Sequence, residues 1–497
     1  EDFDIDDIRY SVITYAASQQ ANAMGPSVVD PRSGEIIEAD VVWWHNVMSL
    51  LHTWMRVQTA PIDPRARANK LSDEHMASAI RFVSSHEVGH TFGLKHNMGA
   101  SHAFPVDSLR SPSFTAKMGG TASSIMDYAR FNYVAQPGDG VKEITPKIGT
   151  YDKFAINWAY RWLDTEIPQE ELPILNEWIQ EHEGDPMYWY GEQQDPKDPI
   201  DPRSQDEDLG DDIVKANRYG IMNLKRIVPN IVAWTEEDGE SFAEAGKLLM
   251  AVINQWKMYA GHVTANVGGI YINNPVKGSP EDRYIPVPKE IQKNSLLWIM
   301  QQIEDLTWLD NSDLIKNCGL ESNISNFAQN YFGNFIFVQL NAMALSESKS
   351  DDPYTQLEAA RDVMNFLMKE SNAGKIPSDN KISLQSMFVD NLIRWSNLTG
   401  KASETSSSFS SILGLALKDT NKKNVLQYYN YIRKYPELIN STTENEGMSA
   451  MQSVRFNVLP ERSHEWYGML LDFKSSLRNA ANKAPTEELK NTYLYQI

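Results

Sequence analysis

The sequence predicts an α+β protein in which a mixed N-terminal part is followed by a mainly α-helical region. Residues 8–44 are rich in β-branched and aromatic side chains, whereas helical periodicity dominates from Asp211 onward. Between these parts, the segment 184–210 is dense in Asp, Pro and Gln. Such a change of composition marks a boundary between domains, so we expect two structurally different parts.

The N-terminal strands come first. Residues 8–15 have the composition of a strand, and Gly25 and Pro26 then interrupt the chain before Ser27, Val28 and Val29. The segment 30–34 has the residues of a tight turn, and the chain returns as a second strand over 35–44. These signals predict a β-hairpin.

Helices follow the hairpin. The pattern predicts a helix over about 45–57, a second one that Ser72 or Asp73 can cap and that ends near Phe92, and a third over 150–163. In the C-terminal region the same periodicity predicts helices over 248–259, 357–368 and 464–477, interrupted by a strand and turn over 268–275.

Composition restricts the class of partner. The chain has 497 residues with 46 basic and 66 acidic side chains, which gives a net charge of −20. This acid excess repels phosphate backbones and anionic lipid head groups, so we expect no nucleic-acid partner. The apolar stretch 335–345 is too short to cross a bilayer, and no membrane span is predicted. The sequence leaves the oligomeric state open.

The strongest functional signal lies in eleven consecutive residues, His86-Glu87-Val88-Gly89-His90-Thr91-Phe92-Gly93-Leu94-Lys95-His96. His86 and His90 are four residues apart, so on a helix both imidazoles project from one face and can reach one Zn²⁺. Glu87 is rotated by about 100° from His86. It is therefore placed to reach a water molecule on the metal and to act as a general base, rather than to complete the ligand set.

Gly93 stands where this helix must stop. A glycine can adopt the left-handed conformation that turns the chain sharply, and the turn would bring His96 to the metal as third ligand. Three protein ligands leave the fourth position of a tetrahedral zinc ion open for water, which is typical of catalytic rather than structural zinc sites. We therefore expect one catalytic Zn²⁺ held by His86, His90 and His96.

With these residues the sequence resembles the metzincin clan of zinc metallopeptidases, in which a methionine-containing turn follows the long zinc motif. The segment Ser124-Ile125-Met126-Asp127-Tyr128 is similar to that turn. The resemblance implies that Met126 lies beneath the histidines as a structural base that does not bind the metal. Tyr128 occupies the position at which some relatives place a tyrosine that stabilises the oxyanion, and packing alone is the alternative role.

The resemblance also implies an architecture: a twisted sheet, the active-site helix, the Met-turn and a closing helix, here 150–163. Its edge strand would pair with an extended substrate, and Ser27, Val28 and Val29 are the candidates, with an ordinary hairpin strand as the alternative. We expect a catalytic domain at 1–165, which starts inside the clan's usual domain and lacks its first strands. An acidic, Pro-rich linker at 166–210 and a helical region of unknown role at 211–497 would follow.

A wider resemblance links the chain to large bacterial zinc-dependent metalloproteases with flanking domains of unknown function. It is based on 30–36, the zinc motif, Tyr190-Gly191-Glu192-Gln193 and 207–212. It implies an exported protein, periplasmic, at the cell surface or secreted, whose export signal is not in this sequence. Asn97, directly after the third histidine, matches none of the residues typical of the best-known metzincin subfamilies, so the subfamily stays open.

An acidic cluster lies around the predicted linker. Its members could offer oxygen ligands to Ca²⁺, but they lack the spacing of a known calcium loop. A solvated linker that leads into a helix start is the favoured interpretation. The cluster consists of Asp195, Asp198, Asp201, Asp206, Asp208, Asp211 and Asp212.

The function predicted is that of a zinc endopeptidase acting on a protein or peptide substrate, with Glu87 as general base and Tyr128 as a possible second catalytic residue. The alternative is a non-catalytic surface or periplasmic binding protein that uses a metzincin-like domain as a platform. The intact Glu87 argues against this alternative, because a protein that no longer hydrolyses peptides has no physical need for the base.

Overall fold

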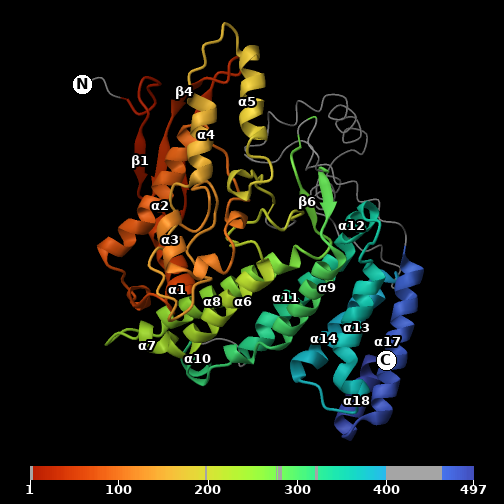
Figure 1. Cartoon of the computed structure of the whole chain (residues 1–497). Coiled ribbons are helices and arrows are strands. Elements are labelled where there is room, and N and C mark those ends of the chain that lie inside the picture. Colours follow the sequence, from red (N-terminus) through yellow and green to blue (C-terminus); the bar gives the residue numbers. More distant parts are fainter. Residues whose placement is uncertain (1–3, 196–198, 276, 278–281, 319–322, 399–461) are drawn as a thin grey trace, which may run out of the picture. The chain divides into compact units, whose positions relative to one another are not determined.

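The computed structural model describes residues 4–195, 199–275, 277, 282–318, 323–398 and 462–497, and within these ranges the fold is mixed α+β (Figure 1). The chain divides into two compact units. The first comprises 1–266, 270–284 and 306–328, and the second comprises 267–269, 285–305 and 329–497. The division into domains at 1–165, 166–210 and 211–497 stays a prediction.

Five short strands open the first unit: β1 (Ile13–Ala16), β2 (Ala23–Met24), β3 (Ser27–Val29), β4 (Ile36–Ala39) and β5 (Val41–Trp44). A three-stranded sheet has the order β1-β5-β2, in which β1 is parallel and β2 antiparallel to β5. Strands β3 and β4 pair antiparallel as a separate hairpin. Strand β2 is therefore the antiparallel edge of the larger sheet.

The predicted hairpin is confirmed, but the prediction of one continuous strand over 35–44 is wrong. The turn closes where expected, since Gly34 donates from its N–H to the Asp30 carbonyl at 2.8 Å and has a φ of 80°. At Asp40 the chain bends: its carboxylate accepts from the Val12 N–H at 2.7 Å, and its own N–H donates to the Pro26 carbonyl. Because of these bonds β4 ends before Asp40, and β5 pairs in the three-stranded sheet instead of continuing the hairpin.

The helices of the first unit are α1 (Val47–Thr59), α2 (Asp73–Thr91), α3 (Pro112–Met118), α4 (Thr150–Tyr160), α5 (Glu171–Gln180), α6 (Ile213–Ile227), α7 (Ile231–Thr235), α8 (Ala243–Thr264) and α10 (Ser312–Asn317), and β6 (Ile270–Ile272) is its last strand. The predicted helices 45–57 and 72–92 and the strand in 268–275 are confirmed. The predicted helix 150–163 ends three residues early, at Tyr160, and the one over 248–259 is longer at both ends.

Helix α2 is the element that positions the site. Ser72 caps it by accepting from the His75 N–H, and Asp73 and Glu74 occupy its first turn, where negative charge is favourable. Its buried face follows helical spacing through Ala79, Phe82 and Val83.

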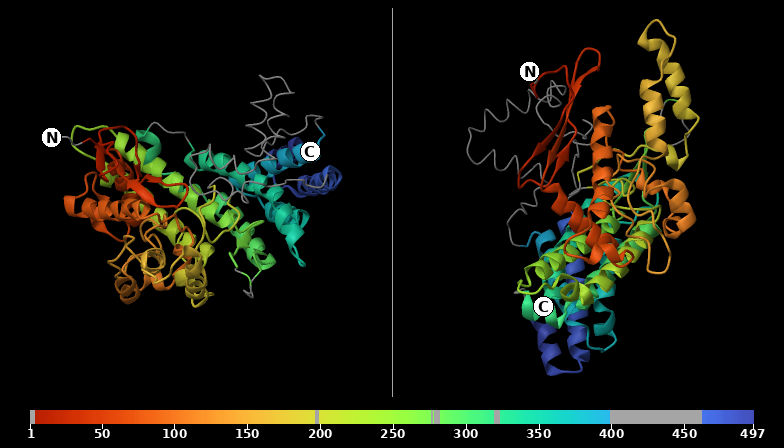
Figure 2. Two further views of the ribbon diagram at one scale, coloured as in Figure 1. Left: turned by 90° about the horizontal axis from the view of Figure 1, so that it is seen from above. Right: turned by 90° about the vertical axis from the view of Figure 1, so that its left-hand side faces the viewer.

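This face packs against α1, β2 and β5, where the first strands (red) lie beside α1 and α2 (orange) in both views of Figure 2. The core so formed contains Ala23, Leu51, Met55, Leu71, Ala79, Phe82, Val83, Ile125, Met126 and Phe131.

The second unit is helical in its described parts: α9 (Lys289–Glu304), most of α11 (Ile324–Ala342), α12 (Ala344–Lys349), α13 (Gln356–Asn372), α14 (Asp379–Trp395), α17 (Ser463–Lys483) and α18 (Glu487–Gln496). The strand β7 (Tyr284–Pro286) lies where the chain passes from one unit to the other. The aromatic core of the second unit is formed by three buried rings, Phe337, Phe388 and Phe473. Within the described residues, no helix combines the length and apolar character that crossing a bilayer requires.

Candidate metal centre

The three histidines of the motif meet at the C-terminal end of α2. His86 and His90 continue the buried face of the helix, one turn apart. The chain then leaves the helix at Gly93, whose φ of 79° is the left-handed conformation that the sequence predicts. The Gly93 N–H donates to the His90 carbonyl at 2.8 Å, and the turn brings His96 back over the helix. The local sequence therefore brings the three side chains to one place.

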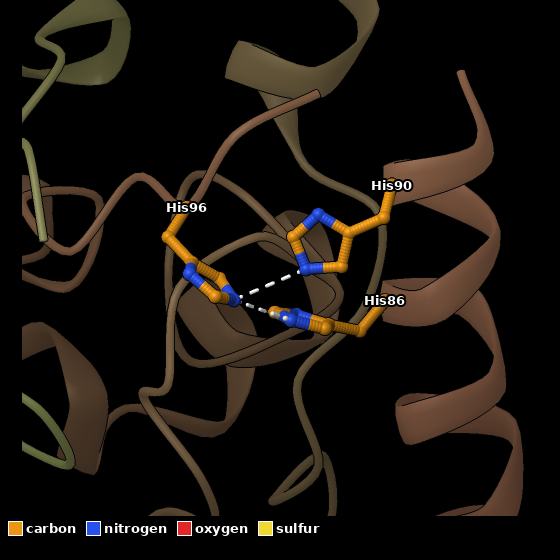
Figure 3. A group of neighbouring side chains, drawn as sticks. All are labelled: His86, His90 and His96. Atoms are coloured by element: carbon orange, nitrogen blue, oxygen red, sulfur yellow. Dashed lines mark hydrogen bonds between the residues drawn. The ribbon is translucent and has the colours of Figure 1, made fainter. Parts of the chain in front are cut away.

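The ring nitrogens converge on one point (Figure 3). The Nε2 atom of His96 lies 3.1 Å from that of His90 and 3.2 Å from that of His86. The ligating atoms of all three residues lie within 4.8 Å of one another. Two nitrogens bound to one tetrahedral zinc at 2.0–2.1 Å are about 3.3 Å apart, so the two short separations match those of a zinc ligand set.

The outer nitrogen of each ring faces an oxygen acceptor. The Nδ1 atoms of His86 and His90 lie 2.8 Å from the main-chain carbonyls of Ile125 and Leu94. The Nδ1 atom of His96 lies 2.7 Å from Oε1 of Gln193. Because carbonyl oxygens only accept, the rings carry their protons on Nδ1 and point the lone pairs of Nε2 inward, as metal-binding histidines do.

Burial favours the neutral form of His86 and His96. Burial, reinforced by the neighbouring histidines, holds the pKa of His86 well below its ordinary value. Burial and the charge of His90 lower the pKa of His96 to about 4. A neutral imidazole is the form that binds a metal, so at neutral pH two of the three ligands need lose no proton on binding.

Met126 packs against α2 at Gly89, between His86 and His90. It is 1 % exposed, and its sulfur lies so close to Gly89 that a Cβ at that position would be 2.2 Å from Sδ. The turn is fixed by Asp152 at the start of α4, whose carboxylate accepts from Ser124 Oγ and from the Ile125 N–H. Because Ile125 also holds His86 through its carbonyl, the Met-turn and the ligand are positioned together.

Tyr128 lies beside two of the ligands. Its ring centroid is 4.7 Å from that of His96 and 5.3 Å from that of His86. The guanidinium of Arg130 also lies over this ring, 4.3 Å from its centroid and 3.9 Å from that of the Trp54 ring. Sequence analysis did not identify Arg130, since no local pattern distinguishes it from other arginines.

Glu87 is 7 % exposed and lies on α2 next to the first ligand. The chain just before β3 approaches the helix here, because a Cβ at Gly25 would lie 2.4 Å from the Glu87 carbonyl oxygen and 2.9 Å from Cβ of His90. Val28 and Val29 in β3 are exposed. Strand β3 thus begins two residues beyond a point that contacts α2.

The acidic cluster is not the solvated linker that the sequence predicts. Asp201 and Asp208 are buried, and burial raises the pKa of Asp206 to about 6. Asp201 pairs with Arg203, and Asp208 shares Ser101 with Asp127.

The predicted helix start is confirmed, because the exposed Asp212 caps α6 by accepting from the Lys215 N–H. Asp198 lies outside the described residues. Among the described residues, the one group of His, Cys, Asp and Glu side chains arranged to hold a metal is the histidine trio, so Ca²⁺ gains no support.

Comparison with known proteins gives one match. The family described as Met-zincin matches residues 68–400, a range that contains α2, the histidine trio, the Met-turn and Gln193. No curated protein and no solved structure matches the chain.

Proposed function

Because the chain belongs to the Met-zincin family, we propose that it is a zinc-dependent endopeptidase. The observation that carries this proposal is the convergence of three imidazoles whose Nε2 atoms lie as close as 3.1 Å, with a glutamate beside the first of them on the same helix. This is the donor set and the base that metal-assisted peptide hydrolysis requires.

His86, His90 and His96 would hold the ion. Bound Zn²⁺ supplies a Lewis acid that polarises the scissile carbonyl and lowers the pKa of a water molecule. The three imidazoles keep their orientation because each Nδ1–H donates to a fixed oxygen. The protein thus contributes a ligand set that needs little reorganisation.

Glu87 acts as the general base and acid. Its carboxylate takes the proton of the attacking water and later delivers it to the nitrogen of the leaving amine. Burial of the side chain, at 7 % exposure, strengthens its electrostatic interactions with the reacting groups.

Tyr128 is the candidate for stabilising the oxyanion. The ring lies against His96 and His86, and the guanidinium of Arg130 stacked over it holds it in place. A hydroxyl that donates to the developing negative charge contributes only in the transition state, so it would raise kcat more than it lowers KM.

The substrate would bind as an extended strand along Ser27, Val28 and Val29. The close approach of Gly25 to the main chain of Glu87 and to His90 supports this proposal, because β3 begins two residues further on. An open strand edge offers main-chain hydrogen bonds to any sequence, which suits an endopeptidase.

A casein digest with and without a zinc chelator, beside the variant Glu87→Gln, tests this function. We expect cleavage that the chelator abolishes and zinc restores, and a loss of more than 100-fold in the variant. Cleavage by Glu87→Gln at the parent rate would sink the mechanism. A zinc-loaded protein that cleaves no member of a wide peptide library would instead favour the binding-platform alternative.

A further inference from the structure

The third histidine is held differently from the other two. Nδ1 of His86 donates to the main-chain carbonyl of Ile125 in the Met-turn, and Nδ1 of His90 donates to that of Leu94 in the turn of the zinc motif itself. His96 instead depends on a side chain, since its Nδ1 lies 2.7 Å from Oε1 of Gln193. Gln193 lies 97 residues further along the chain, in a segment that belongs neither to the zinc motif nor to the Met-turn.

We propose that Gln193 is a positioning residue for the metal ligand His96, and that the segment Trp189–Gln193 is part of the metal centre. The amide oxygen of Gln193 fixes the tautomer and the orientation of the imidazole. Such outer partners of metal ligands typically contribute a factor of about 10–100 to metal affinity. The inference rests on the proposed zinc site.

Asn97 attaches this segment to the motif. It directly follows the third ligand, is completely buried, and bonds to the segment through both ends of its amide. Its Nδ2 donates to the Trp189 carbonyl at 3.0 Å, and its Oδ1 accepts from the Gly191 N–H at 2.8 Å. The Met98 N–H adds a further bond, 2.8 Å, to the Gly191 carbonyl. The residue that departs from the known metzincin subfamilies therefore has a structural role.

Two glycines allow the close approach of the two segments. A Cβ at Gly191 would lie 2.7 Å from the Gly99 backbone, and a Cβ at Gly99 would lie 2.2 Å from the Trp189 ring. Real Cβ atoms do not come so close to backbone atoms. The register between the motif and Trp189–Gln193 is therefore fixed within a narrow range, and with it the position of Gln193.

The residues on either side of Gln193 are also anchored. Ser204 donates from Oγ to the Glu192 carbonyl at 2.9 Å. Gln194 is buried, and its amide bridges the carbonyls of Asp201 and Ser204 at 2.8 and 2.6 Å. Gln193 is thus a half-buried side chain between two fixed neighbours. Such preorganisation is what a partner of a metal ligand requires, because a mobile amide would lose entropy each time it oriented the ring.

Zinc affinity of the full chain tests the proposal. We compare the wild type with Gln193→Leu, which removes the acceptor, and Gln193→Glu, which keeps an oxygen at the same reach. Gln180→Leu, at an exposed glutamine of α5, is the matched control. Competition with a chromophoric chelator measures the zinc Kd, and the melting temperature of the metal-free protein reports folding.

We expect Gln193→Leu to weaken zinc binding by about 10–100-fold, while Gln193→Glu and the control stay within about threefold of the wild type or bind more tightly. Equal affinity of Gln193→Leu and the wild type would overturn the proposal. Loss of affinity in Gln193→Glu equal to that in Gln193→Leu would also overturn it, and this second comparison remains decisive if the leucine variant folds poorly. A wild type that binds no zinc would refute the proposed function itself.

Discussion

Replacing Asn97 with alanine should weaken both the fold of the first unit and the metal centre. Asn97 makes three hydrogen bonds to main-chain groups, with Trp189, Gly191 and Gly99, at 3.0, 2.8 and 3.3 Å. A neutral hydrogen bond contributes about 1 kcal/mol net, so the loss is about 3 kcal/mol. At about 2–4 °C per kcal/mol for a domain of this size class, the melting temperature should fall by roughly 6–12 °C.

The assay is thermal unfolding followed by tryptophan fluorescence, together with a zinc titration of the same sample. Asn176→Ala, at an exposed asparagine of α5, is the control and should melt within about 2 °C of the wild type, because surface substitutions usually change stability by at most about 0.5 kcal/mol. Zinc affinity of Asn97→Ala should fall with the stability, because Gln193 loses the attachment of its segment. An unchanged melting temperature and an unchanged zinc Kd would refute the reasoning.

Four further variants test the site and the packing of the chain. Tyr128→Phe should lower kcat about 100-fold with KM nearly unchanged, and an effect confined to KM would assign the ring to packing or substrate binding. Gly149→Ala places a Cβ 1.9 Å from the Ser123 carbonyl oxygen at the start of α4 and should cost about 1–3 kcal/mol in chemical denaturation. Gly468→Ala in α17, where a Cβ meets nothing within 4 Å, should be neutral or stabilising. Burial and the charge of Asp127 hold the pKa of Asp208 well above its ordinary value. A raised carboxyl pKa stabilises the fold below the unfolded value of about 3.9, and this contribution is lost as pH rises toward the native pKa. Asp208→Asn should therefore flatten the decline of stability as pH rises above about 4, by up to about 1.4 kcal/mol per pH unit, and parallel wild-type and variant curves would contradict the assignment.

The histidine trio could be predicted from the sequence because the spacing and the turn that bring the three residues together are local. Helical spacing aligns His86 with His90, and the left-handed Gly93 returns His96, so eleven residues hold the whole ligand set. The same locality made the cap at Ser72 and the turn at Gly34 predictable. Met126 was identified by resemblance, and its contact with Gly89 gives that resemblance a physical basis.

The partners supplied from far along the chain could not be predicted. Gln193 reaches His96 only through tertiary packing, and no periodicity relates the two. Two sequence features pointed toward this contact: the unusual Asn97 and the segment Tyr190–Gln193. Nothing in the sequence links them, whereas in the structure the Gly191 N–H donates to Asn97 Oδ1. The acidic cluster was misinterpreted because composition alone does not reveal that Asp208 lies buried beside Asp127.

The central claim, that this chain is a peptidase dependent on one zinc ion held by His86, His90 and His96, is tested most directly by titrating zinc into chelator-stripped protein. Bound metal and peptide cleavage would be measured on the same samples. We expect both to saturate at one equivalent per chain in the wild type, and His96→Ala to lose both. Cleavage that persists without zinc, or a wild type that binds no zinc after reconstitution, would contradict the claim.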